Sequence, residues 1–399
     1  MAMILERTKA VPLQLSLPQP QGPRLRDLLV PYIQNTETLW CYELVAIEDF
    51  TQTLPNFPMS MPNLRSLTLE HMIDQPTWDP SADPFELFPN TMTFLSLCDV
   101  PLYPSFLRLG TLTKLVLRYY EVCPPLDAFL DLLGGNCSLE HVDLTIDFEE
   151  FPTPISQHRD VIMNRLRYLS ITCWNVMIAR TMVSSIPLQK GVQLEIALID
   201  QDTELGLNDI LSGISATHLS NLSSPTVMEY RCSPRMIGLN GPNGSFLYTH
   251  DRSSVGSFQG TSFIEFPVLP LTNIQEICLL HSESPTVFRP PSFPALETFA
   301  IGLGANLSHL FSALFSNPSA LPSLKALEFR ECILTEEFME ELTQFASARK
   351  NTTSAWLHRT MIAHQDGKFP NADSIRRLGE HVPVVDVLTL GWVWIYEGI

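Results

Sequence analysis

The chain has 399 residues, 45% of them hydrophobic, with 32 prolines and 18 glycines. This composition supports an extensive core and excludes a collagen-like or disordered chain. The 25 basic residues are outnumbered by 43 acidic ones, which gives a formal net charge of −18. Because binding a nucleic-acid backbone requires clustered Lys and Arg, we expect no nucleic-acid partner, and we expect protein partners with basic segments instead.

The N-terminus, Met1 to Ala10, carries Glu6, Arg7 and Lys9 and lacks the apolar stretch of a secretory signal. We therefore expect a cytoplasmic or nuclear protein. The longest uncharged stretch, residues 298–324, contains several polar residues and prolines, so we expect no membrane association. The eight cysteines form no C-x-x-C pair, and we expect them to serve as small packing residues.

An L-x-x-L-x-L motif, or a close aliphatic variant, recurs along the chain. Neighbouring motifs mostly start 20 to 28 residues apart. This is the repeat length of leucine-rich repeats, in which each unit is a short strand followed by a helix or an irregular return. The motifs start at Leu64, Met92, Leu112, Leu139, Leu166, Ile274, Leu296, Leu324 and Val385.

The motif spacing predicts an α/β leucine-rich-repeat solenoid, with a curved parallel sheet on the concave side and helices and irregular segments on the convex side. Alternate strand residues point to opposite faces, so the leucines face inward and their neighbours outward. One unit cannot bury its apolar face alone, so neighbouring units stack. The residues predicted to be buried are Leu67, Leu69, Leu95, Leu97, Leu115, Leu117, Val142, Leu144, Leu169, Ile171, Leu327 and Phe329.

We expect a single domain over residues 1–399 with about 11 to 13 repeats, with 1–35 as an N-terminal cap and 199–270 as an irregular repeat segment. Counting forward at a period of 27 places motif starts at or beside Leu194, Leu219 and Leu247, so the solenoid is expected to continue through the gap between recognisable motifs.

Helical spacing marks two of the returning segments. Apolar residues recur at three- and four-residue steps from Leu126 to Leu133, before Gly134 and Gly135, and again from Phe338 to Phe345 after Thr335. The short repeat that holds Pro101 and Pro104 has no room for a full helix, so an extended or 3₁₀ return is expected.

Three segments resemble the leucine-rich-repeat region of F-box-like proteins of mushroom-forming fungi: residues 6–17, the helix and strand of 126–144, and 239–246. The resemblance implies an adaptor, in which the F-box docks on a ubiquitin-ligase scaffold and the repeats hold the target.

An F-box needs about 40 to 50 residues, a size near the lower limit for independent folding, and only five residues precede the first segment. We therefore expect the F-box to be absent here, and a ligase scaffold to be a partner only where an F-box lies upstream. A second departure is the Asn/Cys position of the repeat, which only Cys332 fits.

Side chains at outward strand positions are the predicted protein-binding residues. Hot spots in protein interfaces favour Trp, Tyr and Arg, so Arg118, Tyr168 and Arg330 are the preferred anchors. The full predicted set is Arg118, Asp143, Tyr168, Arg330, Thr68, Glu70, Ser170 and Glu328.

No residue pattern nominates a catalytic site, a cofactor site or a metal site. Gly241-Pro-Asn-Gly244 lacks the ending of a phosphate loop, and Asn-Gly favours a tight turn between two strands. His358 and His364, six residues apart on an extended strand, are separated by about 20 Å and so are too far apart to share an ion. The sequence therefore predicts a non-enzymatic recognition scaffold, and the alternative is a hydrolase or other enzyme with a site in residues 199–270.

Overall fold

A computed structural model describes residues 12–18, 32–44, 61–71, 83, 88–120, 124–147, 160–199, 207–211, 214–215, 217–232, 235–251, 271–280, 293–302, 321–330, 332, 334–352, 357, 359–364 and 370–389. The chain divides into two compact units. Unit 1 is Met1–Gln201 with Gly213–Ser220, and unit 2 is Asp202–Ser212 with Asn221–Ile399. A short 3₁₀ turn, Ser220–Leu222, lies at the boundary.

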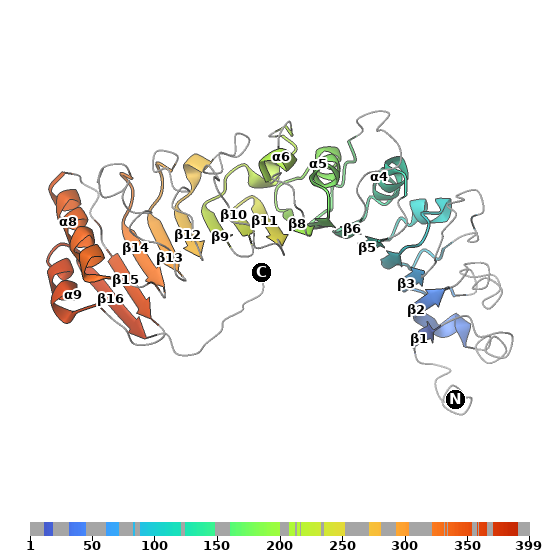
Figure 1. The fold of residues 1–399 in the computed structure, drawn as a ribbon. Coiled ribbons are helices and arrows are strands. Elements are labelled where there is room, and N and C mark those ends of the chain that lie inside the picture. Colours follow the sequence, from blue (N-terminus) through green and yellow to red (C-terminus); the bar gives the residue numbers. More distant parts are fainter. Residues whose placement is uncertain are drawn as a thin grey trace, which may run out of the picture. The chain divides into compact units, whose positions relative to one another are not determined.

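Unit 1 contains a parallel sheet of eight strands among its described residues, and the strands follow one another in chain order (Figure 1). Each strand pairs in parallel with the next. The strands are β1 (Leu13–Pro18), β2 (Thr36–Leu44), β3 (Ser66–His71), β4 (Phe94–Cys98), β5 (Lys114–Tyr119), β6 (His141–Ile146), β7 (Tyr168–Cys173) and β8 (Gln193–Ile199).

Leucines form two continuous inward rows across this sheet because the strands pair without a shift at the motif leucines. Leu67 aligns with Leu95, Leu115, Val142 and Leu169 across β3 to β7. All twelve residues predicted to be buried are at most 1% exposed. The predicted core positions are therefore confirmed.

The same backbone hydrogen bond precedes each of the first eight motifs. The amide of the first motif residue donates to the carbonyl three residues earlier, at 2.8 to 3.2 Å, for Leu64, Met92, Leu112, Leu139, Leu166, Ile274, Leu296 and Leu324. The next residue then donates to the equivalent position of the preceding strand, as in Arg65 N–H to Glu37 O at 2.8 Å. A tight turn thus brings each strand into the sheet in the same way.

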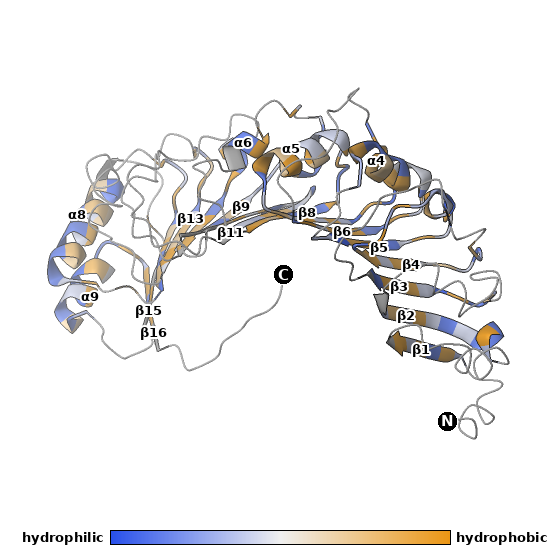
Figure 2. Cartoon of the chain, turned by 45° about the vertical axis from the view of Figure 1, so that its right-hand side comes forward, coloured by the Kyte–Doolittle hydropathy of each residue, from blue (hydrophilic) through white to orange (hydrophobic). Residues whose placement is uncertain are grey.

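Returning segments of unit 1 cover one face of its sheet (Figure 1). They include η1 (Ile33–Asn35), the 3₁₀ helix η2 (Pro104–Arg108), α4 (Leu126–Gly135) and α5 (Val176–Ser185). The predicted helix before Gly134 and the predicted 3₁₀ return are both confirmed. Figure 2 shows hydrophobic segments in α4 and α5, and hydrophobic and hydrophilic positions alternating along the strands.

Unit 2 also contains eight strands within the described residues, in the order β11-β10-β9-β12-β13-β14-β15-β16. From β9 onward neighbouring strands are parallel, whereas β10 is antiparallel to both β9 and β11. The strands are β9 (Val227–Cys232), β10 (Arg235–Gly241), β11 (Gly244–Asp251), β12 (Glu276–Leu280), β13 (Thr298–Gly302), β14 (Ala326–Arg330), β15 (Arg359–His364) and β16 (Val384–Thr389).

The returns of unit 2 include α6 (Leu207–Leu211), η4 (Leu271–Asn273), α8 (Glu336–Thr352) and α9 (Ala372–Gly379). The helix predicted after Thr335 is confirmed, and the Thr335 hydroxyl oxygen accepts a hydrogen bond from the Phe338 N–H at 3.2 Å. Gly241 and Gly244 face each other across the end of the β10–β11 hairpin, so the turn predicted there is also confirmed.

Four predicted motif starts are wrong in register. Leu194 aligns with Leu169 in an inward row, three residues after the position of a motif start, and Leu219 makes an isolated bridge with Leu188. Leu247 lies in the antiparallel hairpin opposite Gly238. Val385 aligns through Thr360 with Leu327, so the start of its repeat is Val382, which is 1% exposed. Counting at a fixed period failed at Leu247 because an antiparallel hairpin interrupts the repeats there, and spacing alone could not show it.

The architecture is thus α/β, with a long, mostly parallel sheet and few helices in the described part of the chain, as in a solenoid-like arrangement. Among these residues no helix is long and apolar enough to span a membrane. The single-domain prediction over 1–399 stays a prediction. The N-terminal cap, 1–35, lies mostly outside the described residues.

Candidate functional site

Six of the eight predicted binding residues lie in unit 1, on the outward positions of the sheet. We call this surface the open face and describe it across β3 to β8 as three rows set by the strand register. The first row is Ser66, Phe94, Lys114, His141, Tyr168 and Gln193. The middle row is Thr68, Ser96, Val116, Asp143, Ser170 and Glu195. The last row is Glu70, Cys98, Arg118, Thr145, Thr172 and Ala197.

The middle row is made mostly of small side chains. Ser96, Val116 and Ser170 are at most 9% exposed, although they point away from the leucine core. Of the predicted residues in this row, Asp143 and Ser170 are direct neighbours, while Thr68 lies three strands away from Asp143.

Tyr168 is held from two sides. Its ring stacks on the imidazole of His141 in the neighbouring strand, with 4.4 Å between the ring centroids and 18° between the planes. Its hydroxyl donates to Glu195 Oε2 at 2.7 Å, a contact that β8 supplies. Burial, together with this hydrogen bond, raises the pKa of the Tyr168 phenol to about 12. A tyrosine fixed in this way loses little conformational freedom when a partner packs against it.

Arg118 is exposed at the last position of the open face on β5, beside Cys98 and Thr145. The side chain of Cys98 is half-buried, and burial together with Asp99 and Glu70 raises the pKa of its thiol to about 11. At neutral pH this thiol is protonated, so it lacks the character of a nucleophile. Tyr120 lies just after β5 and is 45% exposed, whereas Tyr119 is fully buried.

Glu328 and Arg330 lie in unit 2, on β14. The Arg330 guanidinium donates to the Glu328 carboxylate, with 2.7 Å between Nη2 and Oε2, on the same face of one strand. The structure therefore places the eight predicted residues on two surfaces, six on the open face of unit 1 and two on unit 2.

Three residues of this surface were missed by the sequence reasoning. Trp40 is 49% exposed and aligns with Thr68, which extends the middle row onto β2. His141 and Glu195 hold Tyr168. Trp40 has no motif leucine before it, because Thr36 occupies that position, and the two partners of Tyr168 follow only from the strand register.

The segment 199–270, proposed as the alternative enzyme site, contributes one ionisable pair within unit 1. His218 Nε2 lies 3.2 Å from Asp160 Oδ1, and Ser215 and Thr217 share a hydroxyl contact at 2.8 Å beside it. The Ser215 oxygen accepts from the Thr217 N–H, as in a local turn. The enzyme interpretation stays a prediction.

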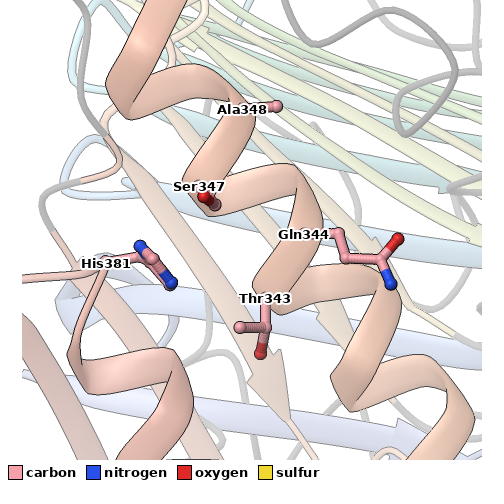
Figure 3. Close-up of a pocket in the computed structure, with 5 residues that line it drawn as sticks. All are labelled: Thr343, Gln344, Ser347, Ala348 and His381. Carbon is pink, nitrogen blue, oxygen red and sulfur yellow. The ribbon is translucent and has the colours of Figure 1, made fainter.

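In unit 2 an open hollow of about 370 Å³ lies between α8 and the end of α9 (Figure 3). Thr343, Gln344, Ser347, Ala348 and His381 line it. Within the described ranges no group of three or more His, Cys, Asp or Glu side chains is arranged to hold a metal ion. His358, whose distance from His364 argues against a shared ion, lies outside those ranges.

Comparison with known proteins adds no assignment. No family model matches the chain, and no curated protein matches it.

Proposed function

We propose that the chain is a non-enzymatic protein-recognition scaffold built from leucine-rich repeats, and that the open face of unit 1 binds the partner. The observation that carries this proposal is the convergence of Arg118, Asp143 and Tyr168 on one sheet face, with Tyr168 already fixed by His141 and Glu195. Rigid aromatic and arginine side chains are typical anchors of protein interfaces.

The turn that recurs before the first eight motifs supports the repeat type. A second feature is Cys332, at the repeat position where leucine-rich repeats place Asn or Cys. Its sulfur lies 3.4 Å from Ile301 O and 3.6 Å from Arg330 O, so its single S–H is shared between these two acceptors, and the contact with Ile301 links neighbouring repeats. A polar side chain at this position satisfies backbone groups that the parallel strands leave without a ladder partner.

The partner we propose carries basic segments, because the net charge is −18. Charge of this kind acts mainly on the association rate, whereas Arg118, Tyr168 and, in unit 2, Arg330 would set the dissociation rate as anchors. The resemblance to F-box-like proteins supports a more specific version, in which these repeats are the target-binding part of a ubiquitin-ligase adaptor in the cytoplasm or nucleus.

Affinity purification followed by mass spectrometry, run in parallel with wild type and a variant, tests the proposal. The variant combines Arg118→Ala, Tyr168→Ala and Arg330→Ala, and its fold is checked by circular dichroism. The wild type should retain a true partner. The variant should bind that partner more weakly, by at least about 2 kcal/mol, because the loss of one hot spot is sufficient. Equal affinity of the folded variant would reject the open face as the binding site.

A ligase scaffold among the retained proteins would support the adaptor version only if the protein used carries an upstream F-box. The matched control is the same protein without that F-box. The scaffold should disappear from the control, while the target stays bound to the repeats.

A further inference from the structure

Two aromatic rings meet at the N-terminal side of the open face. Trp40 and Tyr42 lie two residues apart on β2, so both point outward from the sheet. Their ring centroids are 6.0 Å apart and their planes are inclined at 63°. Trp40 is 49% exposed, the largest exposed aromatic surface among the described residues, and Tyr42 is partly exposed. We call this pair the aromatic corner.

The neighbours of the aromatic corner leave about half of Trp40 exposed. Strand pairing places Ser16 on one side of Trp40 and Thr68 on the other. Ser16 is exposed and Thr68 partly exposed, and both side chains are short. An indole flanked in this way gains little from burial within its own sheet, so packing within the sheet does not account for a tryptophan at this place.

One carboxylate lies beside the corner. Glu70 follows Thr68 by two residues on β3, so it shares the outward face, and it is partly exposed. Two ring faces at a steep angle attract a cation through their quadrupoles, and a nearby carboxylate adds to that attraction. Both features select a positively charged group and disfavour a phosphate.

We propose that the Trp40–Tyr42 corner is a binding site for a lysine or arginine side chain in a basic segment of a protein partner. This inference rests on the proposed function, since it names the chemistry that the open face would recognise. The excess of 43 acidic over 25 basic residues favours the same kind of partner over the whole chain. The corner adds a specific contact to this general attraction, because a tryptophan face recognises a cation at short range.

The test uses the whole chain and two peptide probes, (Gly-Lys)₄ and the same peptide with every lysine acetylated. Binding is followed by NMR on the indole N–H signal of Trp40, which is assigned from its disappearance in the Trp40→Phe variant. We expect the lysine peptide to shift this signal and the acetylated peptide to leave it in place. Equal shifts with both peptides would overturn the proposal.

Variants separate a cation–π contact from apolar packing. Trp40→Phe keeps a weaker ring face, whereas Trp40→Leu keeps apolar bulk without one. The affinity for (Gly-Lys)₄ should fall in the order Trp, Phe, Leu, with a loss of about two- to fivefold for leucine. Because Trp40 is half-exposed, both variants should fold, and circular dichroism checks this. Unchanged affinity of the folded Trp40→Leu variant would also overturn the proposal.

Tyr120→Leu is the matched control. Tyr120 is 45% exposed, but it lies beside the cationic Arg118 and outside the corner, so its loss should leave the peptide affinity unchanged. A captured partner distinguishes the aromatic corner from the anchors Arg118, Tyr168 and Arg330. A partner lost by the Arg118, Tyr168 and Arg330 variant but kept at full affinity by Trp40→Leu would contradict the corner and support the open face. Peptide binding that depends on Trp40, together with a partner whose affinity is unchanged in the triple variant, would support the corner and reject Arg118, Tyr168 and Arg330 as anchors.

Discussion

The ring of Tyr168 stacks on the imidazole of His141, at 4.4 Å between centroids, and joins two neighbouring strands on the open face of unit 1. Glu195 on the following strand accepts the hydrogen bond of the same tyrosine. Three consecutive strands therefore fix one partly exposed aromatic side chain before any partner is bound. An anchor fixed in advance reduces the entropy that binding costs.

The pKa of His141 should rise in the Lys114→Met variant. Burial lowers this pKa below its ordinary value of 6.5, Lys114 lowers it further, and Asp143 opposes both effects. Removing the like charge of Lys114 favours the protonated imidazole, whereas Asp143→Asn should lower the pKa further. A pH titration of the His141 ring protons by NMR measures both shifts, and shifts of the opposite sign would contradict the contacts described.

The phenol of Tyr168 should titrate near pH 12 in the wild type and lower in the Glu195→Gln variant. Burial is the main cause of the raised pKa, and the carboxylate of Glu195 adds to it by hydrogen bonding and by its charge. Glutamine keeps an acceptor oxygen but removes the charge, so only part of the shift should be lost. NMR of ¹³C-labelled tyrosine follows the titration, and Tyr120→Phe identifies the signal of Tyr120, whose pKa is also raised by burial.

Leu144→Ala should lower the free energy of unfolding by roughly 2 to 5 kcal/mol. Leu144 is fully buried in an inward row, and its truncation removes buried apolar surface and leaves a cavity. Thr145→Ala on the same strand is the matched control, because Thr145 points to the open face, and its effect should stay within about 0.5 kcal/mol. Denaturant unfolding measures both changes, and a loss below about 1 kcal/mol for Leu144→Ala would show that this strand is misplaced.

Gly135→Ala should destabilise unit 1 by roughly 1 to 3 kcal/mol. A Cβ atom at Gly135 would overlap the backbone carbonyl of Leu107, which cannot move aside as a side chain can. Gly134→Ala provides the control, since its Cβ atom would lie 3.7 Å from Val161 Cγ1, an ordinary contact. The control should keep or raise the stability by up to about 1 kcal/mol because alanine favours the helix. Similar melting curves for the two variants would contradict the packing of α4.

Protonation of Glu336 in acid should destabilise the contact between α8 and α9. Its carboxylate accepts hydrogen bonds from the Ser374 hydroxyl and, at 3.1 Å, from the Asn371 N–H, and these bonds lower its pKa. A group with a lowered folded-state pKa stabilises the fold above its unfolded pKa, and the contribution is lost as the pH falls through the folded pKa. The melting temperatures of the wild type and of Glu336→Gln should therefore differ at neutral pH and converge in acid. A difference in melting temperature that stays constant with pH would refute this role of Glu336.

The sequence predicted the inward rows because leucine spacing is a local signal. Leu67 and Leu69 alternate with polar residues, and this period of two places them on one face wherever the strand pairs. The helix after Leu126 and the hairpin at Gly241 were predicted for the same reason, since spacing and turn residues act within a few positions.

Contacts set by register could not be predicted in this way. Glu195 lies 27 residues from Tyr168, and their hydrogen bond depends on the length of α5 and its flanking turns. Trp40 was missed because Thr36, and not a leucine, occupies the first motif position of its repeat. The antiparallel pairing of β10 with β9 and β11 interrupts the repeat period, which explains why Leu247 was assigned to a motif start.

Hydroxyl-radical footprinting of the chain, alone and with a captured partner, tests the open face most directly because it reports the exposure of individual side chains. Trp40 and Tyr168 should become protected in the complex, while Met177, 51% exposed on α5 at the covered face of the sheet, should keep its reactivity. Protection of Met177 with unchanged Trp40 and Tyr168 would contradict the account.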